Sequence, residues 1–160
     1  MPRRAARGTY MLLLALAAEC TLKIGRAGTM RFAAGGYCYV GSALGAGGLA
    51  ARLRRHASAG RPRHWHIDYL LPDTRLIGAL VADDATRHEC TWAAWVFRHP
   101  GSTALTGFGA SDCGCPAHLF HIGSDLDDPR FARAAQKALA VRFVPAARFT
   151  PGRGQASAFC

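Results

Sequence analysis

The sequence contains no apolar run long enough to cross a bilayer. Its longest uninterrupted apolar stretch, residues 11–18, falls well short of the roughly 20 residues that a membrane-spanning helix needs. The basic start followed by apolar residues has the outline of a secretory signal, but Gly8, Thr9 and Tyr10 interrupt the apolar pattern. We therefore expect a short basic leader at residues 1–7, a buried strand from Thr9, and no membrane partner.

Regular cysteine spacing is also absent. A chain of 160 residues can bury a core without disulfides, and its cysteines lack the spacing of a secreted, disulfide-held scaffold. This favours reduced thiols and a cytoplasmic protein. The six cysteines are Cys20, Cys38, Cys90, Cys113, Cys115 and Cys160.

Acidic residues are scarce. Ten aspartates and glutamates stand against 20 lysines and arginines, so the formal net charge is +10 at pH 7. Such an excess favours a polyanionic partner, with nucleic acid ahead of an acidic membrane surface. Net charge alone leaves open a soluble protein that is merely basic, so the placement of the arginines must decide.

The glycine-rich turn at residues 41–48 lacks the lysine of a nucleotide-binding loop. Gly48 and Leu49 stand where the G-x-x-x-x-G-K-[ST] pattern requires lysine and a hydroxyl residue. The turn leads into an expected helix, residues 49–57, whose turn of 100° per residue gathers Arg52, Arg55 and His56 on one flank. That flank is either an ordinary solvated basic face or a site where these groups meet the tyrosines of the preceding strand.

The remaining pattern predicts alternating strands and helices without an internal repeat. HWHIDYLL, residues 64–71, is the start of a helix or strand, and residues 107–122 read as a loop followed by a strand. The closing TPGRGQASAFC, from residue 150, is typical of a mobile tail. We expect strands at 9–18, 21–24, 30–33, 37–40 and 74–82, and helices at 49–57, 89–99 and from Asp127 to about Val141.

Several short motifs follow one another in a telling order. They are GTY at residues 8–10, YVG at 39–41, RLRRH at 52–56 and E-x-x-W at 89–92. Together with the longer blocks GSALGAGGL, HWHIDYLL and GFGASDCGCPAHLF, they resemble the GIY-YIG nuclease superfamily, and within it the Uri-type branch called domain of unknown function 123. The resemblance covers residues 8–120.

This resemblance implies an α+β fold with a small three-stranded antiparallel central sheet flanked by helices. The nuclease-like domain would span residues 8–124, and residues 125–160 would form a C-terminal helix and a flexible tail. In such a sheet Tyr10 and Tyr39 would lie side by side, with Arg52 reaching over them from the helix.

The resemblance also implies an activity: a divalent-metal-dependent endonuclease that hydrolyses DNA phosphodiester bonds, with branched or damaged DNA among its candidate substrates. Tyr39 or Tyr10 would position and deprotonate the attacking water, and Arg52 would stabilise the charge at phosphorus. Glu89 would be the single protein ligand of Mg²⁺ or Mn²⁺, since a lone carboxylate leaves room for waters and the substrate phosphate.

Two histidines match positions where the family assists proton transfer, and one family feature is missing. The histidines are His56 and His64, whereas the family asparagine of a GYN-like segment has only residues 107–109, GFG, as its nearest counterpart. A module that binds nucleic acid without cutting it is therefore the alternative function. In either case the expected DNA-contacting residues are Arg54, Arg55, Arg63 and Trp65.

A second cluster of chemically active residues lies in SDCGCPAHLFH, residues 111–121. Its thiols and imidazoles suit zinc, but C-x-C is tighter than the usual C-x₂-C spacing. We favour packed thiols beside a histidine that faces the site, with zinc as the less favoured interpretation and Asp112 as an additional metal or water ligand. The candidate ligands are Cys113, Cys115, His118 and His121.

Overall fold

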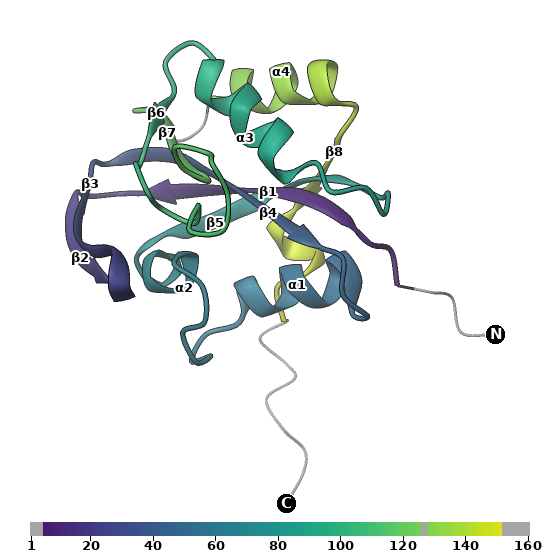
Figure 1. Cartoon of the computed structure of the whole chain (residues 1–160), viewed down its shortest axis with the longest axis horizontal. Coiled ribbons are helices and arrows are strands. Elements are labelled where there is room, and N and C mark those ends of the chain that lie inside the picture. Colours follow the sequence, from purple (N-terminus) through teal and green to yellow (C-terminus); the bar gives the residue numbers. More distant parts are fainter. Residues whose placement is uncertain (1–4, 126–127, 152–160) are drawn as a thin grey trace, which may run out of the picture.

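The computed structural model describes residues 5–125 and 128–151. Within these residues the chain forms one six-stranded antiparallel sheet with helices on both faces, and a separate two-stranded ribbon (Figure 1). The strands are β1 (Gly8–Leu16), β2 (Cys20–Ile24), β3 (Gly28–Phe32), β4 (Gly35–Ala43), β5 (Arg75–Ala82), β6 (Thr103–Ala104), β7 (Leu119–Gly123) and β8 (Arg142–Pro145). The α-helices are α1 (Gly48–Ala57), α2 (Ile67–Leu70), α3 (Glu89–Arg98) and α4 (Arg130–Leu139), with 3₁₀ turns at residues 25–27, 71–73 and 146–148.

The strand β1 lies in the interior of the sheet. The strand order is β6-β7-β4-β1-β5-β8, and all nine residues of β1 are buried. A strand that is covered on both faces needs apolar side chains on both, which explains why GTYMLLLAL shows an almost continuous apolar run in place of alternation.

The expected three-stranded sheet is wrong. The strands β4, β1 and β5 are extended by β7 and then β6 on one side and by β8 on the other. The outermost strands, β6 and β8, could not be predicted from the sequence because they are short and mostly solvent-facing, so neither carries an alternating apolar pattern.

The helices form one layer on each face of the sheet (Figure 1). On one face α1 and α2 bury their apolar residues against alternate residues of β1, and on the other face α3 and α4 do so. The first core includes Tyr10, Leu12, Leu14, Leu49, Leu53, Ile67 and Leu70. The second includes Met11, Leu13, Val40, Trp92, Val96, Phe131 and Ala135.

The predicted helices at 49–57 and 89–99 are confirmed to within one residue, whereas the C-terminal helix is shorter than expected. It begins at Arg130, after Pro129, and the Asp128 carboxylate accepts the Arg130 backbone N–H at 2.9 Å. It ends where Ala140 adopts a left-handed conformation, with φ of 52°. Asp127 and the tail residues 152–160 lie outside the described residues.

Segments beyond residue 124 complete the same core. Phe131 and Ala135 of α4 are buried against the sheet, and β8 pairs with β5. None of the helices within residues 5–125 and 128–151 combines the length and the apolarity that a membrane span requires.

Candidate active-site cleft

A cleft of about 530 Å³ collects side chains from several elements. The strands β1 and β4, the helices α1 and α3, the loop before α2 and the loop 105–118 all contribute to it. Five of the six residues predicted to be catalytic line this one cleft, together with Trp65: they are Tyr10, Tyr39, Arg52, His64 and Glu89. His56 lies behind Tyr10, outside the lining.

Tyr10 and Tyr39 lie on the same face of the sheet but not directly opposite each other. Tyr10 pairs with Gly41, and Leu12 pairs with Tyr39, so the tyrosines are diagonal neighbours, which corrects the expected side-by-side placement. The Tyr10 ring can lie over Gly41 because glycine has no side chain: a Cβ there would meet the Tyr10 hydroxyl at 2.5 Å. The glycine of YVG therefore provides the space in which the Tyr10 phenol lies.

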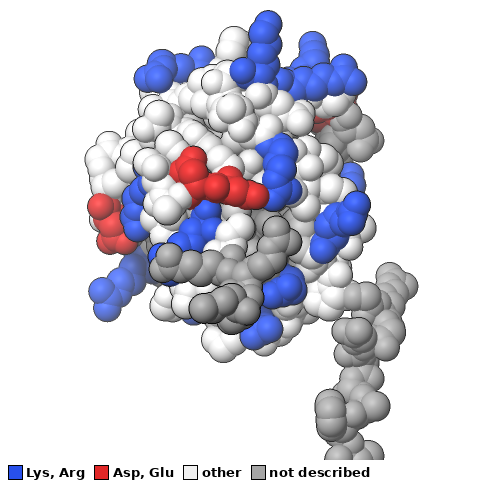
Figure 2. Space-filling model, turned by 90° about the vertical axis from the view of Figure 1, so that its right-hand side faces the viewer, with Lys and Arg blue, Asp and Glu red and all other residues white. Residues whose placement is uncertain are grey.

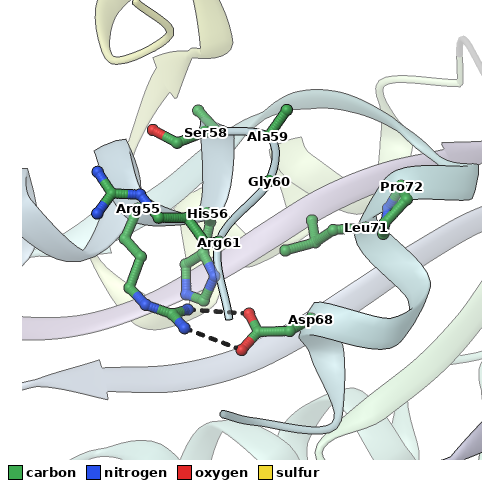
Figure 3. A pocket seen from close by; sticks show the side chains of 10 residues that line it. Arg55, His56, Ser58, Ala59, Gly60, Arg61, Asp68, Leu71 and Pro72 are labelled. Carbon is green, nitrogen blue, oxygen red and sulfur yellow. Dashed lines mark hydrogen bonds and ion pairs between the residues drawn. The ribbon is translucent and has the colours of Figure 1, made fainter. Parts of the chain in front are cut away.

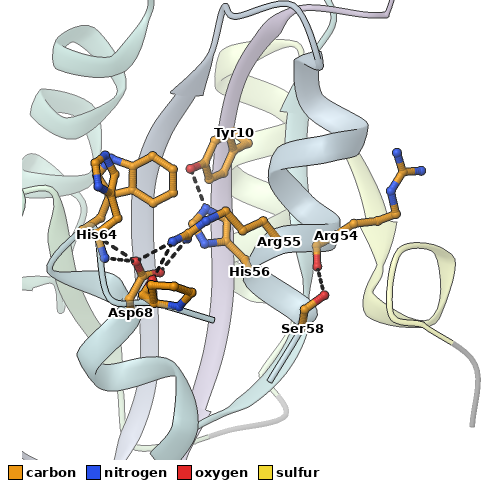
Figure 4. Close-up of polar contacts among 9 residues, drawn as sticks. Tyr10, Arg54, Arg55, His56, Ser58, His64 and Asp68 are labelled. Atoms are coloured by element: carbon orange, nitrogen blue, oxygen red, sulfur yellow. Dashed lines mark hydrogen bonds and ion pairs between the residues drawn. The ribbon is translucent and has the colours of Figure 1, made fainter. Parts of the chain in front are cut away.

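The Tyr10 hydroxyl is hydrogen-bonded to the imidazole of His56. The Oη and Nε2 atoms are 2.8 Å apart, and both side chains are buried (Figure 4). Burial is the largest effect on the pKa of His56 and lowers it to about 4, so the imidazole is neutral at pH 7. Burial also raises the pKa of Tyr10 and of Tyr39 well above the usual value, so both phenols hold their protons.

Arg52 and Arg55 both stack against Trp65. Their guanidinium carbons lie 4.2 and 4.3 Å from the centre of the indole ring, within cation–π range. Arg52 is on the cleft wall, so the stacked indole holds its charged head beside the two tyrosines.

Arg55 is committed to contacts inside the protein. Its guanidinium forms a two-pronged pair with Asp68, at 2.9 and 3.1 Å (Figures 3 and 4). It also donates to the Pro62 carbonyl at 3.0 Å. Asp68 also accepts the backbone N–H groups of His64 and Trp65. Among the predicted DNA-contacting residues, Arg55 thus anchors the loop that carries Trp65.

The other predicted DNA-contacting arginines are solvent-facing. Arg54 is exposed on α1, and Arg63 is exposed beside the Tyr69 ring, 4.7 Å from its centre. On the face of the molecule that includes the start of β1, lysine and arginine side chains are spread over the surface with few acidic ones between them (Figure 2). The basic side chains on this face are spread out and do not form a single patch.

Glu89 opens α3 at the edge of the cleft, and both of its carboxylate oxygens have partners. Ser42 donates its hydroxyl to Oε2 at 2.7 Å, and Nδ1 of His118 lies 3.0 Å from Oε1, although the ring is not turned for a linear hydrogen bond. Burial alone would raise the pKa of Glu89, but the contacts with His118 and Ser42 outweigh it and lower that pKa. The carboxylate is therefore ionised at neutral pH.

The predicted Cys/His cluster forms, with one change of member. The potential ligand atoms of Cys90, Cys113, Cys115 and His118 all lie within 4.8 Å of one another, so the cluster could hold a metal ion. His121 is not part of it and instead donates from Nε2 to the Ala34 carbonyl at 3.1 Å. Cys113 is exposed, so packing into a core does not account for it.

Sequence reasoning missed three residues of this region. Ser42 follows YVG directly, Arg87 lines the cleft two residues before Glu89, and Cys90 comes directly after that glutamate. The adjacency of Ser42 and Cys90 to recognised motifs was the only signal in the sequence, because their partners come from distant segments. Asp112, predicted as an additional ligand, does line the cleft.

Comparison with known proteins gives one match. The sequence profile of the family described as "Domain of unknown function DUF123" matches residues 9–140. The chain belongs to the DUF123 family. The part matched to DUF123 includes every cleft residue named above and extends through α4. Searches of curated proteins and of solved structures gave no match for the chain.

Proposed function

We propose that this DUF123 domain is an endonuclease of the GIY-YIG type that hydrolyses DNA phosphodiester bonds with the help of a divalent metal ion. The observation that carries the proposal is the convergence of Tyr10, Tyr39, Arg52 and Glu89 on one cleft from β1, β4, α1 and α3. A net charge of +10 fits a polyanionic substrate. The proposal includes a reducing, cytoplasmic setting, and the five described cysteines form no disulfide.

The carboxylate of Glu89 suits Mg²⁺ or Mn²⁺. It is ionised, borders the cleft and is a hard oxygen donor, and the Asp112 carboxylate lines the same cleft. A metal ion bound there would polarise the phosphoryl oxygen and lower the pKa of a bound water. Ser42 fixes the orientation of Glu89 through its hydroxyl.

Arg52 stabilises the extra negative charge at phosphorus in the transition state. Its guanidinium is held against the Trp65 ring, so little side-chain freedom is lost when a phosphate enters the cleft. A planar guanidinium can also donate two parallel hydrogen bonds to phosphate oxygens, which a lysine cannot do.

Tyr10 and its partner His56 accept the proton that the attacking water loses. The phenol oxygen accepts the water proton as the phenol passes its own proton to Nε2 of the neutral His56, 2.8 Å away. The new bond joins the water oxygen to phosphorus, the bond to the leaving sugar oxygen breaks, and solvent protonates that oxygen. Tyr39 borders the same space and positions the water.

Trp65 and the exposed arginines supply affinity for DNA. The ring of Trp65 already carries Arg52 and Arg55, so its partly exposed edge is what borders the cleft for contact with a base, and the solvent-facing Arg54 and Arg63 can neutralise phosphates. His64 is exposed on the rim of the cleft.

A cleavage assay tests the proposal. Purified protein is incubated with supercoiled plasmid, single-stranded DNA and branched DNA, each with Mg²⁺, Mn²⁺ or EDTA. We expect nicking or cutting of at least one substrate that needs the metal, and a loss of about 10²–10³-fold in rate for Arg52→Ala. Arg31→Ala, which removes an exposed arginine paired with Glu19 on the separate ribbon, is the matched control. Metal-independent binding without cleavage of any substrate would instead support a nucleic-acid-binding module.

A further inference from the structure

Four soft ligands come together next to the cleft from two separate parts of the chain. Cys90 lies in the first turn of α3, and the other three residues, Cys113, Cys115 and His118, belong to the loop 105–118 before β7. We propose that these four residues bind one zinc ion. The zinc site does not depend on the nuclease activity, and only its link to Glu89 rests on the proposed function.

The ligand spacing suits tetrahedral zinc. With zinc–sulfur and zinc–nitrogen bonds of about 2.3 and 2.0–2.1 Å, tetrahedral ligands lie about 3.5–3.8 Å apart. The Sγ of Cys113 and the Nε2 of His118 are 3.4 Å apart, and no pair of ligand atoms in the cluster exceeds 4.8 Å. The longest pair would have to contract by at most about 1 Å to reach the tetrahedral spacing.

The ligand chemistry selects zinc over the hard cations. Three thiolates and one imidazole form the Cys₃His set typical of closed structural zinc sites, whereas Mg²⁺ prefers oxygen ligands. Zinc would occupy this cluster and leave Glu89 to the catalytic cation.

A zinc ion at this position would have a structural role, because the loop around it has little regular structure. Residues 105–118 join β6 to β7 with little regular structure, and they are held by hydrogen bonds such as Gly107 N–H to the Pro116 carbonyl, at 2.8 Å. A zinc ion shared with Cys90 would tie this loop to the start of α3. The loop in turn forms one wall of the cleft through Gly109, Ser111 and Asp112.

His118 connects the zinc cluster to the cleft. Its Nε2 faces Cys113, and its Nδ1 lies 3.0 Å from the carboxylate of Glu89. When Nε2 binds zinc, the ring proton must lie on Nδ1, from which a small rotation of the ring would let it be donated to Glu89. Zinc would thereby fix the tautomer of His118 and position Glu89, which is also anchored through its chain neighbour Cys90. His118 is then a positioning residue, not a catalytic one.

Metal analysis of untagged protein, dialysed against buffer without metal, tests the zinc site. We expect about one zinc per chain, and intense thiolate-to-metal absorption when cobalt replaces zinc. Cys90→Ser, at an exposed position that should not prevent folding, should lose the zinc, whereas Cys20→Ser on the separate ribbon should keep it. Zinc far below one equivalent in the wild type, full zinc in Cys90→Ser, or a disulfide between Cys113 and Cys115 would overturn the proposal.

The link to Glu89 is tested without any cleavage assay. Binding of Mn²⁺, followed by electron paramagnetic resonance, should weaken about 10-fold or more in zinc-free Cys90→Ser, because the carboxylate is no longer oriented. Glu89→Gln should keep its zinc and lose Mn²⁺. Equal Mn²⁺ affinity with and without zinc would contradict the link while leaving the zinc site itself intact.

Discussion

Tyr10 of β1 and His56 of α1 are 46 positions apart in the sequence, yet the hydroxyl of one lies 2.8 Å from Nε2 of the other in the buried layer between sheet and helix. This hydrogen bond links α1 to the central strand β1, and the Tyr10 side chain that forms it borders the cleft. Buried polar groups are costly when they lose their partners, so this pair affects stability as well as chemistry.

Replacement of Tyr10 by phenylalanine should reduce both stability and cleavage. The change leaves His56 without its partner in a buried position, which costs about 1–3 kcal/mol of unfolding free energy. Tyr37→Phe is the matched control, because the Tyr37 hydroxyl donates to the Ala33 carbonyl at 2.6 Å on the same sheet, away from the cleft. Urea denaturation and the cleavage rate are measured for both. If Tyr37→Phe and Tyr10→Phe lose activity equally, the cleft role of Tyr10 is wrong.

The stability of the domain should depend on pH through His56. Its pKa is about 4 in the folded state against an ordinary value of 6.5, because burial and the charges of Arg52 and Arg55 outweigh Asp68. Between these two pH values the unfolded chain binds a proton that the folded chain does not. Stability is therefore full above pH 6.5 and falls as the pH is lowered towards 4.

The loss of unfolding free energy follows from the size of the His56 pKa shift, and it is at most about 3 kcal/mol between pH 6.5 and pH 4. Unfolding free energies of wild type and His56→Gln, measured at a series of pH values, should show a shallower slope for the variant. His64→Gln, which changes an exposed histidine, should keep the wild-type slope. Parallel curves for wild type and His56→Gln would contradict a neutral, buried His56.

Gly41→Ala should displace Tyr10. A Cβ at this position would approach the Tyr10 hydroxyl to 2.5 Å, closer than real contacts allow, so the phenol must move or β4 must shift. We expect a lower melting temperature and a large loss of cleavage. Gly45→Ala, four residues further along, meets nothing within 4 Å and serves as the folding control. A Gly41→Ala variant as stable as Gly45→Ala would show that the tyrosine does not need this space.

Arg54 and Arg55 are neighbours with different expected roles. Arg55→Ala removes the partner of the largely buried Asp68 carboxylate and should destabilise the fold by about 1–3 kcal/mol. Arg54→Ala should leave stability unchanged but lower the salt dependence of DNA binding by about one unit in the log–log slope. Thermal melts and binding isotherms at several salt concentrations separate the two. The assignment fails if Arg55→Ala is as stable as Arg54→Ala.

The sequence predicted those parts of the fold whose pattern is local. The helices α1 and α3 and the strands β1 and β5 have long apolar patterns, so their positions were clear within a few residues. The edge strands β6 and β8 were missed because two to four mostly exposed residues carry no periodicity. Their pairing is set by tertiary contacts.

The candidate site divides in the same way. Tyr10, Tyr39, Arg52 and Glu89 were recognised from the order of short motifs, and the structure brings them together at one cleft. Cys90 was missed because a set of ligands that comes from a helix and a distant loop has no recognisable spacing in the sequence. Arg55 was expected to contact DNA because its partner, Asp68, lies 13 residues away in the sequence and no local pattern shows the pair.

The catalytic claim is tested most directly by the two glutamates of the chain, Glu19 and Glu89. Glu89→Gln keeps the size of the side chain but removes the charge at the cleft. Glu19→Gln makes the same change at an exposed position directly before β2, where Glu19 pairs with Arg31. The cleavage rate in Mg²⁺ is measured for wild type and both variants on the substrate that wild type cuts best. If Glu89 holds the catalytic metal ion, we expect a loss of about 10²–10³-fold for Glu89→Gln, with DNA binding nearly unchanged, and a wild-type rate for Glu19→Gln. Equal rates for wild type and Glu89→Gln would contradict this role of Glu89.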